Sequence, residues 1–295
     1  MNMEKRLKKV TVIVLIVVGV LLIGAVILGV LNALVGNGEW TFGWTDYRYD
    51  ESGYESGEGS IPSNAVTKIE LDWIDGGVEI VPCQDAYISV SETAAEELSD
   101  SARLRWKVGA DGTLSIKYRE SSWFFGIGLG NREKKLTLRI PEKYFEQLTE
   151  IEISAASANV VVTGISVKAF DFEAASGSLV VKECVIPNFS AETVGGKIVT
   201  DGLDTAAVSV ESVGGEIDLK LPVCPNELDI STTGGNITLR LPADSSFALE
   251  WDTVGGKISY DLPIVRSANR YVCGDAAASF DVETVGGSLT LVVIE

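Results

Sequence analysis

The sequence of 295 residues contains no histidine and only four cysteines. Without an imidazole group, histidine-based catalytic triads, proton relays and most zinc hydrolases are excluded. The sequence has no C-x-x-C pair either, so a zinc site built from thiolates is not indicated. We therefore expect no metal site and no cofactor.

Positive charge is also scarce. The chain has 24 lysines and arginines against 42 aspartates and glutamates, which gives a formal net charge of −18. The first nine residues carry +3, so the remainder carries −18 − 3 = −21. A domain this acidic is repelled by nucleic acid and by anionic lipid headgroups, which excludes nucleic acid as a partner. Cationic partners, calcium and uncharged glycans remain open.

A long apolar run occurs once, at residues 10–35, where Thr11 and Asn32 are the only polar side chains. About 20 apolar residues span a bilayer, so this run predicts a transmembrane anchor. The basic tail at 1–9 predicts a cytoplasmic N-terminus and an extracytoplasmic C-terminal domain, hence a single-pass protein of the cytoplasmic membrane. A cleaved signal peptide is the alternative, but the run is too long for one and NALVG is a poor cleavage site.

Residues 36–62 are rich in glycine, serine, acidic and aromatic residues, which is typical of a linker. We expect the aromatic residues nearest the anchor to lie at the membrane interface, where such side chains collect: Trp40, Phe42 and Trp44. The rest is expected to be a flexible spacer, which includes Tyr47, Tyr49 and Tyr54.

A glycine phrase recurs after this segment: ETVGGKI at 192–198 returns as DTVGGKI at 252–258 and as ETVGGSL at 283–289. The second glycine of each phrase serves as a reference, and the copies fall at Gly76, Gly177, Gly196, Gly215, Gly235, Gly256 and Gly287, with Ala158 at the same place in one further copy. From Ala158 onward the intervals are 19, 19, 19, 20, 21 and 31 residues. A near-constant interval of this size is typical of a solenoid, and the last interval indicates an insertion in one coil.

Apolar residues alternate with polar ones on both sides of each reference glycine, as in Val208 and Val210 before Gly215 and Ile217 and Leu219 after it. This pattern predicts a strand, a corner and a second strand in each unit. The units could stack as coils, or each Gly-Gly could close a hairpin in an antiparallel meander. The likeness of equivalent positions favours stacked coils, because a meander does not require it.

We therefore predict an all-β fold, a β-solenoid of about eight coils of about 20 residues over residues 63–295, with an irregular hairpin section at 83–148. The reference glycines would allow a corner at which a Cβ atom would clash. A phosphate-binding role is not indicated, because no G-x-x-x-x-G-K-[ST] motif is present and no helix follows the glycines.

The tandem h-x-h-x-[ST]-V-G-G-x-I-x-h units behind an apolar N-terminal run resemble the bacterial β-strand-repeat proteins labelled "putative adhesin", a family of unknown function. The resemblance covers roughly residues 66–295. It implies a β-solenoid-like fold and a cell-envelope setting, sometimes tied to envelope stress and the response to antimicrobial peptides. It supplies no catalytic motif.

Acidic residues recur four positions before the reference glycine, with Ser231 as an exception: Glu173, Glu192, Glu211, Asp252 and Glu283. If the coils stack, these carboxylates form a column on one outer face. Two interpretations remain open. The column could be a solvated surface that opposes aggregation, or it could recruit calcium or a cationic peptide through multiple charges.

A second candidate is the segment 120–135, ESSWFFGIGLGNREKK, between two predicted strands. It contains Trp123, Phe124 and Phe125, and exposed apolar clusters mark interaction sites. The loop could enter a membrane, helped by Arg132, Lys134 and Lys135, or it could hold a partner. It could equally fold back and cap the open end of the solenoid.

The cysteines are Cys83, Cys184, Cys224 and Cys273. An even number outside the cell suggests disulfides. Cys184 and Cys224 are two predicted coils apart, however, about 9–10 Å along the stack, which exceeds the separation that a disulfide spans. We expect these cysteines to be small buried side chains.

We predict a non-enzymatic binding, scaffold or stress-sensing module outside the membrane. Its partners could be a membrane protein, a cationic peptide or a glycan, since a nine-residue tail has no room for a signalling domain. The alternatives are a surface adhesin and a polysaccharide hydrolase or lyase, for which paired carboxylates could serve: Asp201, Asp204, Glu216 and Asp218.

Overall fold

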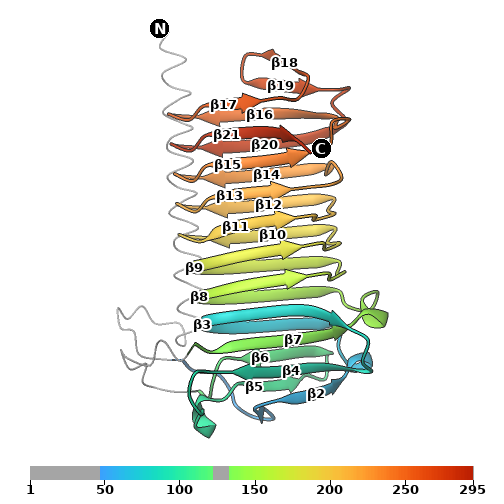
Figure 1. The fold of residues 1–295 in the computed structure, drawn as a ribbon, viewed down its shortest axis with the longest axis vertical. Coiled ribbons are helices and arrows are strands. Elements are labelled where there is room, and N and C mark those ends of the chain that lie inside the picture. The colour runs from blue at the N-terminus through green and yellow to red at the C-terminus, as the bar shows by residue number, and fades with distance from the viewer. Residues whose placement is uncertain (1–46, 122–132, 295) are drawn as a thin grey trace.

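The structure, a computed structural model, describes residues 47–121 and 133–294, and these form a tall stack of β-strands (Figure 1). Helical structure in these two ranges is limited to short 3-10 turns: η1 (Ser63–Ala65), η2 (Asp100–Ala102) and η3 (Glu142–Tyr144). None of the helices found there could span a membrane, and the predicted anchor at 10–35 lies outside the described residues.

Each repeat contributes one strand to each of two facing sheets. The chain makes a first strand, turns at the glycine corner, makes a second strand, and then turns into the next repeat (Figure 1). The first strands form sheet A, which contains β10 (Asn188–Thr193), β12 (Ala207–Ser212), β14 (Glu227–Thr232), β16 (Phe247–Thr253) and β20 (Ala278–Thr284). The second strands form sheet B, which contains β11 (Lys197–Asp201), β13 (Ile217–Lys220), β15 (Ile237–Leu241), β17 (Ile258–Tyr260) and β21 (Leu289–Val293).

Three longer strands run through the corner and belong to both sheets: β3 (Lys68–Cys83), β8 (Glu150–Thr163) and β9 (Ala169–Lys182). Neighbouring repeats pair in parallel and in register. Val208, for example, is paired with Phe189 on one side and with Leu228 on the other. This pattern confirms stacked coils, and it excludes a meander, in which successive units would pair antiparallel.

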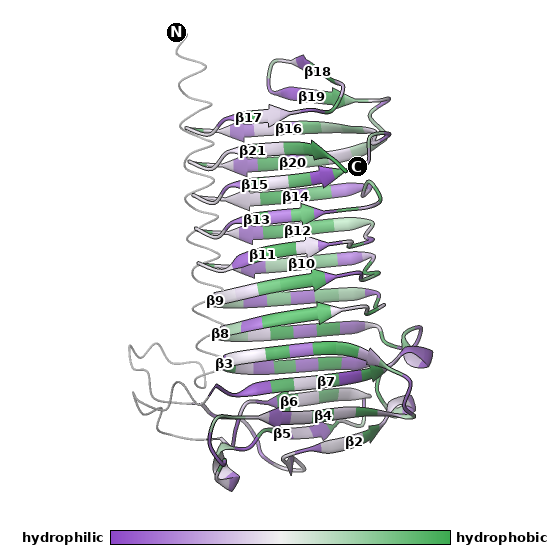
Figure 2. Cartoon of the chain, viewed as in Figure 1, coloured by the Kyte–Doolittle hydropathy of each residue, from purple (hydrophilic) through white to green (hydrophobic). Residues whose placement is uncertain are grey.

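The core lies between the two sheets. Alternate residues of each strand are buried, as the repeated change between apolar and polar segments along the strands shows (Figure 2). Because the coils are in register, like side chains stack on one another, and the rings of Phe170 and Phe189 lie 5.9 Å apart and nearly parallel. The alternation that predicted strands is therefore the same pattern that fills the core.

The order of the coils in space differs from their order in the chain at both ends. The coil formed by β6 (Thr113–Lys117) and β7 (Lys135–Pro141) lies outside β3, although it follows β3 in the sequence. The last coil, β20 and β21, lies between the coil β14/β15 and the coil β16/β17. Within the described ranges the stack is therefore β6/β7, β3, β8, β9, β10/β11, β12/β13, β14/β15, β20/β21 and β16/β17.

The long interval before the last glycine phrase forms the C-terminal cap. Within it, β18 (Ile264–Ser267) and β19 (Arg270–Cys273) make a hairpin, and β19 pairs antiparallel with β16. This hairpin covers the outer edge of sheet A. The spacing of the repeats revealed the insertion, but it carried no information about which coil the last repeat would pair with.

The N-terminal cap is built on strands that pair antiparallel with the outermost coil, β6/β7. β4 (Tyr87–Thr93) and β2 (Gly59–Pro62) extend sheet B, while β5 (Arg105–Val108) and β1 (Glu55–Ser56) extend sheet A. Tyr47 is 3% exposed, and its hydroxyl accepts a hydrogen bond from the Tyr118 amide at 3.1 Å.

The hydroxyl of Tyr49 donates to the Arg119 carbonyl oxygen at 2.7 Å, and its ring packs edge-on against Tyr54 with centroids 5.0 Å apart. The interpretation of these three tyrosines as spacer residues is therefore wrong: the described part of the expected linker, residues 47–62, is packed onto the first coil. Glycine and serine content hid this, although Tyr47 and Tyr49 already have the spacing of a strand.

Candidate binding face and glycine corner

The threonine or serine of the repeated phrase caps the corner. The Thr193 Oγ1 atom accepts a hydrogen bond from the Gly196 amide at 2.9 Å, three residues on. The same bond recurs in the other four coils that carry the phrase: Ser212 to Gly215 at 3.0 Å, Thr232 to Gly235 at 3.2 Å, Thr253 to Gly256 at 2.8 Å and Thr284 to Gly287 at 2.9 Å. A buried amide is thus satisfied where the strand ends.

The reference glycine is required by the neighbouring coil. A Cβ atom at Gly215 would lie against the carbonyl oxygen of Gly196 in the coil beside it. The other reference glycines face a neighbouring carbonyl oxygen in the same way: Gly76, Gly177, Gly196, Gly235, Gly256 and Gly287. Gly76 and Gly177 also have φ angles of +88° and +103°, which side chains rarely adopt. The phrase is therefore explained by the stacking of backbone corners.

The acidic residues of sheet A form columns along the stack. The column of the candidate carboxylates contains, in spatial order, Lys117, Asp72, Ser154, Glu173, Glu192, Glu211, Ser231, Glu283 and Asp252. Glu283 precedes Asp252 in this order because the last coil lies inside the stack. A second acidic column two residues away includes Asp171, Asp229, Asp281 and Glu250.

The two outer faces differ in charge. Six neighbouring strand segments of sheet A, in spatial order the part of β9 before the corner, β10, β12, β14, β20 and β16, contain no lysine or arginine. They contain ten acidic residues: Asp171, Glu173, Glu192, Glu211, Glu227, Asp229, Glu250, Asp252, Asp281 and Glu283. We call this surface the acidic face. The strands of sheet B in the same coils contain four cations, Lys182, Lys197, Lys220 and Arg240, and two acids, Asp201 and Asp218.

Sheet B pairs its acids with cations of the neighbouring coil. Lys220 contacts Asp201 at 2.8 Å, and Arg240 contacts Asp218 at 3.0 Å. Lys197, in turn, contacts Glu216 at 3.0 Å. Three of the acids considered for a hydrolase are thus held in ion pairs, and the fourth, Asp204, lies in a turn outside the strands. The structure gives no support to a paired-carboxylate reaction at these four residues.

The acidic face lacks such partners. In residues 47–121 and 133–294, none of its ten carboxylates forms an ion pair, although Asp252 accepts a hydrogen bond from Asn269 at 3.4 Å. Partial burial against neighbouring coils, and next the charge of adjacent carboxylates, raises the pKa of Glu173, Glu192 and Glu211. The same causes raise the pKa of Asp281 and Glu283. A raised pKa means that the ionised carboxylate is less stable at its place in the column than it would be in water.

No metal-binding geometry accompanies these acids. Among the residues that the structure describes, no group of three cysteine, aspartate or glutamate side chains is arranged to hold an ion. The four cysteines are free, and Cys184 and Cys273 are buried. A closed calcium site is thus not seen on the acidic face, and any attraction of cations there comes from the charge of the face as a whole.

The aromatic residues of the second candidate, Trp123, Phe124 and Phe125, lie outside the described residues. The end of that segment is described, and there Lys134 is buried. Its ammonium group contacts Glu92 at 2.7 Å, donates to the Ala102 carbonyl oxygen at 2.8 Å and lies 4.4 Å from the centre of the Tyr118 ring. Lys134 is therefore a buried part of the N-terminal cap, so the part given to Lys134 in the membrane-entry alternative is wrong.

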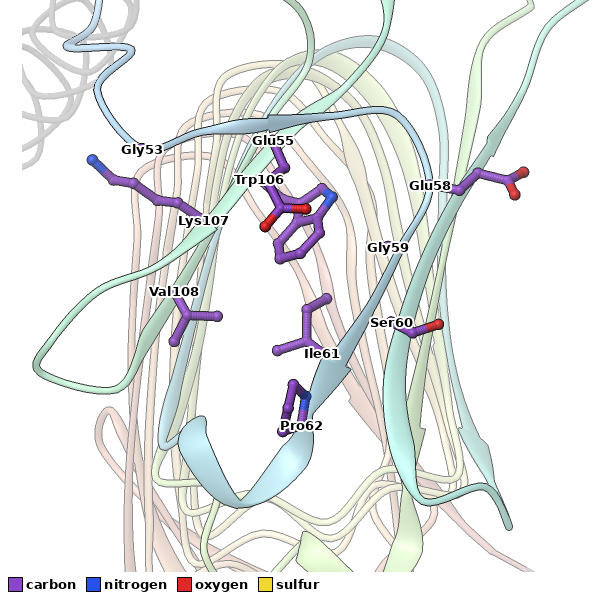
Figure 3. Close-up of a pocket in the computed structure, with 10 residues that line it drawn as sticks. All are labelled: Gly53, Glu55, Glu58, Gly59, Ser60, Ile61, Pro62, Trp106, Lys107 and Val108. Atoms are coloured by element: carbon purple, nitrogen blue, oxygen red, sulfur yellow. The ribbon is translucent and has the colours of Figure 1, made fainter.

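One hollow near this cap is a surface groove between β2 and β5, of about 470 Å³ (Figure 3). Trp106, Ile61 and Val108 point into it, while Glu58 and Ser60 point away. Trp106 is only 8% exposed. The apolar side chains of this groove belong to the end of the core, and the Trp106 ring at its base is almost fully covered by its neighbours.

These features define a class of protein: a two-sheet parallel β-solenoid, closed at both ends by hairpins, with one acidic face whose own six strand segments contain no lysine or arginine. The chain belongs to the Toastrack DUF4097 family, whose model matches residues 66–291. No protein with a curated description matches it.

Solved structures similar to this chain come from three bacteria. A "putative cell adhesion protein" from Clostridium sporogenes is 14% identical with a TM-score of 0.43, and the match covers 82% of this chain and 100% of that one. A "putative adhesin" from Bacteroides fragilis is 14% identical with a TM-score of 0.45, covering 82% and 98%. Another from Parabacteroides distasonis is 15% identical with a TM-score of 0.42, covering 83% and 98%. Likenesses at this level carry no argument about what this chain binds.

Proposed function

We propose that this protein is a non-enzymatic binding module displayed outside the cytoplasmic membrane, and that it holds a cationic peptide or protein segment on its acidic face. One observation carries this proposal: the two sheets share a scaffold but not a charge pattern. Sheet B places cations beside its acids. The candidate column of sheet A stacks acid on acid in β9, β10 and β12 and again in β20 and β16, with Ser231 of β14 between these two groups. The fold therefore does not impose the repulsion.

That repulsion has a cost. Two unit charges about 4.8 Å apart repel by roughly 0.9 kcal/mol in a water-like dielectric before salt screening. A cationic partner that lies along the columns would relieve this repulsion in several coils at once, so binding would be multivalent. A merely solvated surface would need no such difference between the faces.

The position near a membrane is part of the proposal and is supported by the apolar run and the basic tail. The described residues begin at Tyr47, which is packed on the domain, so at most residues 36–46, which is 46 − 35 = 11 residues, separate the domain from the expected anchor. A fully extended segment of this length spans at most about 40 Å. The acidic face would therefore meet peptides that approach the membrane surface.

The test is the binding of a fluorescent decalysine peptide to the full-length protein in discs of uncharged lipid, measured by anisotropy at several salt concentrations. The variant Glu173→Gln/Glu192→Gln/Glu211→Gln removes three charges from the acidic face. Its matched control, Glu79→Gln/Asp201→Asn/Glu216→Gln, removes three charges from the side of sheet B.

We expect the acidic-face variant to bind about 10-fold more weakly, from roughly 0.5 kcal/mol for each lost exposed contact. The control should bind nearly as well as the parent. Equal losses in the two variants would mean that only net charge matters, and no binding by the parent at low salt would contradict the proposal outright.

A further inference from the structure

The last coil occupies an unusual place in the stack. Residues 278–293 follow β19 in the chain but lie between two coils that were completed earlier, β14/β15 and β16/β17. The pairing is in register on both sides: Thr284 is paired with Thr232 on one side and with Thr253 on the other. The rest of the chain thus provides a slot, and the last coil fills it.

The connection into the slot is short and locally strained. Four residues, 274–277, link β19 to β20, and both Gly274 and Ala276 have positive φ angles, +61° and +62°. Alanine rarely adopts this conformation, so the backbone is strained at Ala276. The Ser246 Oγ atom holds the turn by accepting hydrogen bonds from the Asp275 and Ala277 amides, each at 3.1 Å.

We propose that the last coil is exchanged between two copies of this chain, so that residues 278–294 of each copy fill the slot of the other. An exchanged coil makes the same contacts as the coil of the closed monomer, because the slot and the coil have the same sequence in both copies. The difference between the two states lies in the connection at 274–277. A short, strained hinge favours the open form, in which the positive φ at Ala276 is released.

The geometry of the stack allows this exchange. The connection lies on the edge opposite the glycine corner, where the turns between coils run. Two copies that meet along this turn edge would place each connection beside the slot of the partner. Two turns on that edge also carry exposed apolar side chains, Val185 at 47% and Val223 at 50%, which such a contact would cover. A second copy is therefore the occupant that this edge fits.

The test measures whether the last coil and the slot that holds it belong to one chain or to two. Asp229 and Asp281 are partners on adjacent strands, one in the slot and one in the last coil. Equal amounts of ¹⁵N-labelled and unlabelled full-length Asp229→Cys/Asp281→Cys protein are unfolded, mixed, refolded together in detergent at high concentration and oxidised. The isotope content of the peptides joined by this disulfide then reports whether the two strands come from one chain or from two. The matched control is Ser190→Cys/Ser209→Cys, a pair in adjacent coils that are not exchanged.

We expect about half of the joined 229–281 peptides in the dimer fraction to combine one labelled and one unlabelled half, as random exchange requires, and the 190–209 peptides to be uniformly labelled or unlabelled. Adding Ala276→Gly, which relieves the strain, should lower the mixed share. Joined peptides of a single isotope in every sample would overturn the proposal. Equal mixing in the 190–209 control would overturn it too, because exchange would then not be specific to the last coil.

Discussion

Replacing a reference glycine by alanine should destabilise the stack, and Gly215→Ala is the sharpest case. The added Cβ atom would lie against the Gly196 carbonyl oxygen, so two coils must move apart at their corner. The amide of Gly215 would also shift relative to Ser212, whose hydroxyl it reaches at 3.0 Å. Overpacking of this kind costs about 1–3 kcal/mol. We expect a loss of about 2 kcal/mol, which lowers the melting temperature by roughly 4–8 °C in a domain of this size.

The neighbouring glycine of the same phrase is the control. A Cβ atom at Gly214 would be 3.8 Å from its nearest neighbour, the Val194 carbonyl oxygen, an ordinary contact. Gly214→Ala should therefore change stability by no more than about 0.5 kcal/mol. The measurement is guanidinium unfolding of the full-length protein in detergent, followed by circular dichroism. If the two variants unfold at the same denaturant concentration, the carbonyl contact between coils is not what requires the glycine.

Three other predictions concern charge and hydrogen bonding. Burial against the neighbouring coils, and next the charge of adjacent carboxylates, raises the folded-state pKa values of Glu192 and Glu211 above the 4.5 of an unperturbed glutamate. The ionised groups therefore destabilise the fold above the raised pKa, and this destabilisation is relieved as the pH falls through the raised pKa toward 4.5. Glu211→Gln should thus be more stable than the parent at pH 7, by up to about 0.9 kcal/mol, and this gain should shrink toward pH 4 in thermal melts. Ser212→Ala removes the acceptor of a buried amide and should cost about 1–3 kcal/mol in guanidinium unfolding, whereas Ser212→Thr should cost little. Lys134→Met leaves the Glu92 carboxylate buried without its ammonium partner and should cost about 3–5 kcal/mol, and adding Glu92→Leu should recover part of that loss.

Much of the central stack could be predicted from the sequence, because its signals are local. Alternation fixes which face of each strand is buried, and the interval near 20 residues fixes one coil per repeat. Likeness at equivalent positions, such as Ile198, Ile217 and Ile237, then identifies the register, which the structure shows residue by residue. The column of Glu173, Glu192 and Glu211 follows directly from that register.

The ends could not be predicted in this way, because their arrangement depends on long-range pairing. Nothing in the phrase around Gly287 says that its coil pairs with β14/β15 on one side and with β16/β17 on the other. Lys134 was misassigned because a lysine in a loop is usually exposed, whereas here Glu92 and two carbonyl oxygens satisfy it inside the cap. The repeat spacing already indicated one acidic outer face and one of mixed charge, but the ion pairs that link neighbouring coils of sheet B are seen only in the structure.

Locating the contact decides whether the acidic face holds a cationic partner. Decalysine bound to the full-length protein in uncharged-lipid discs is coupled to nearby carboxylates with a carbodiimide, and the joined residues are identified by mass spectrometry. We expect the joined residues to concentrate at Glu173, Glu192 and Glu211 and their neighbours in sheet A. Cross-links spread equally over both sheets, or concentrated at Asp201, Glu216 and Asp218, would contradict the proposal.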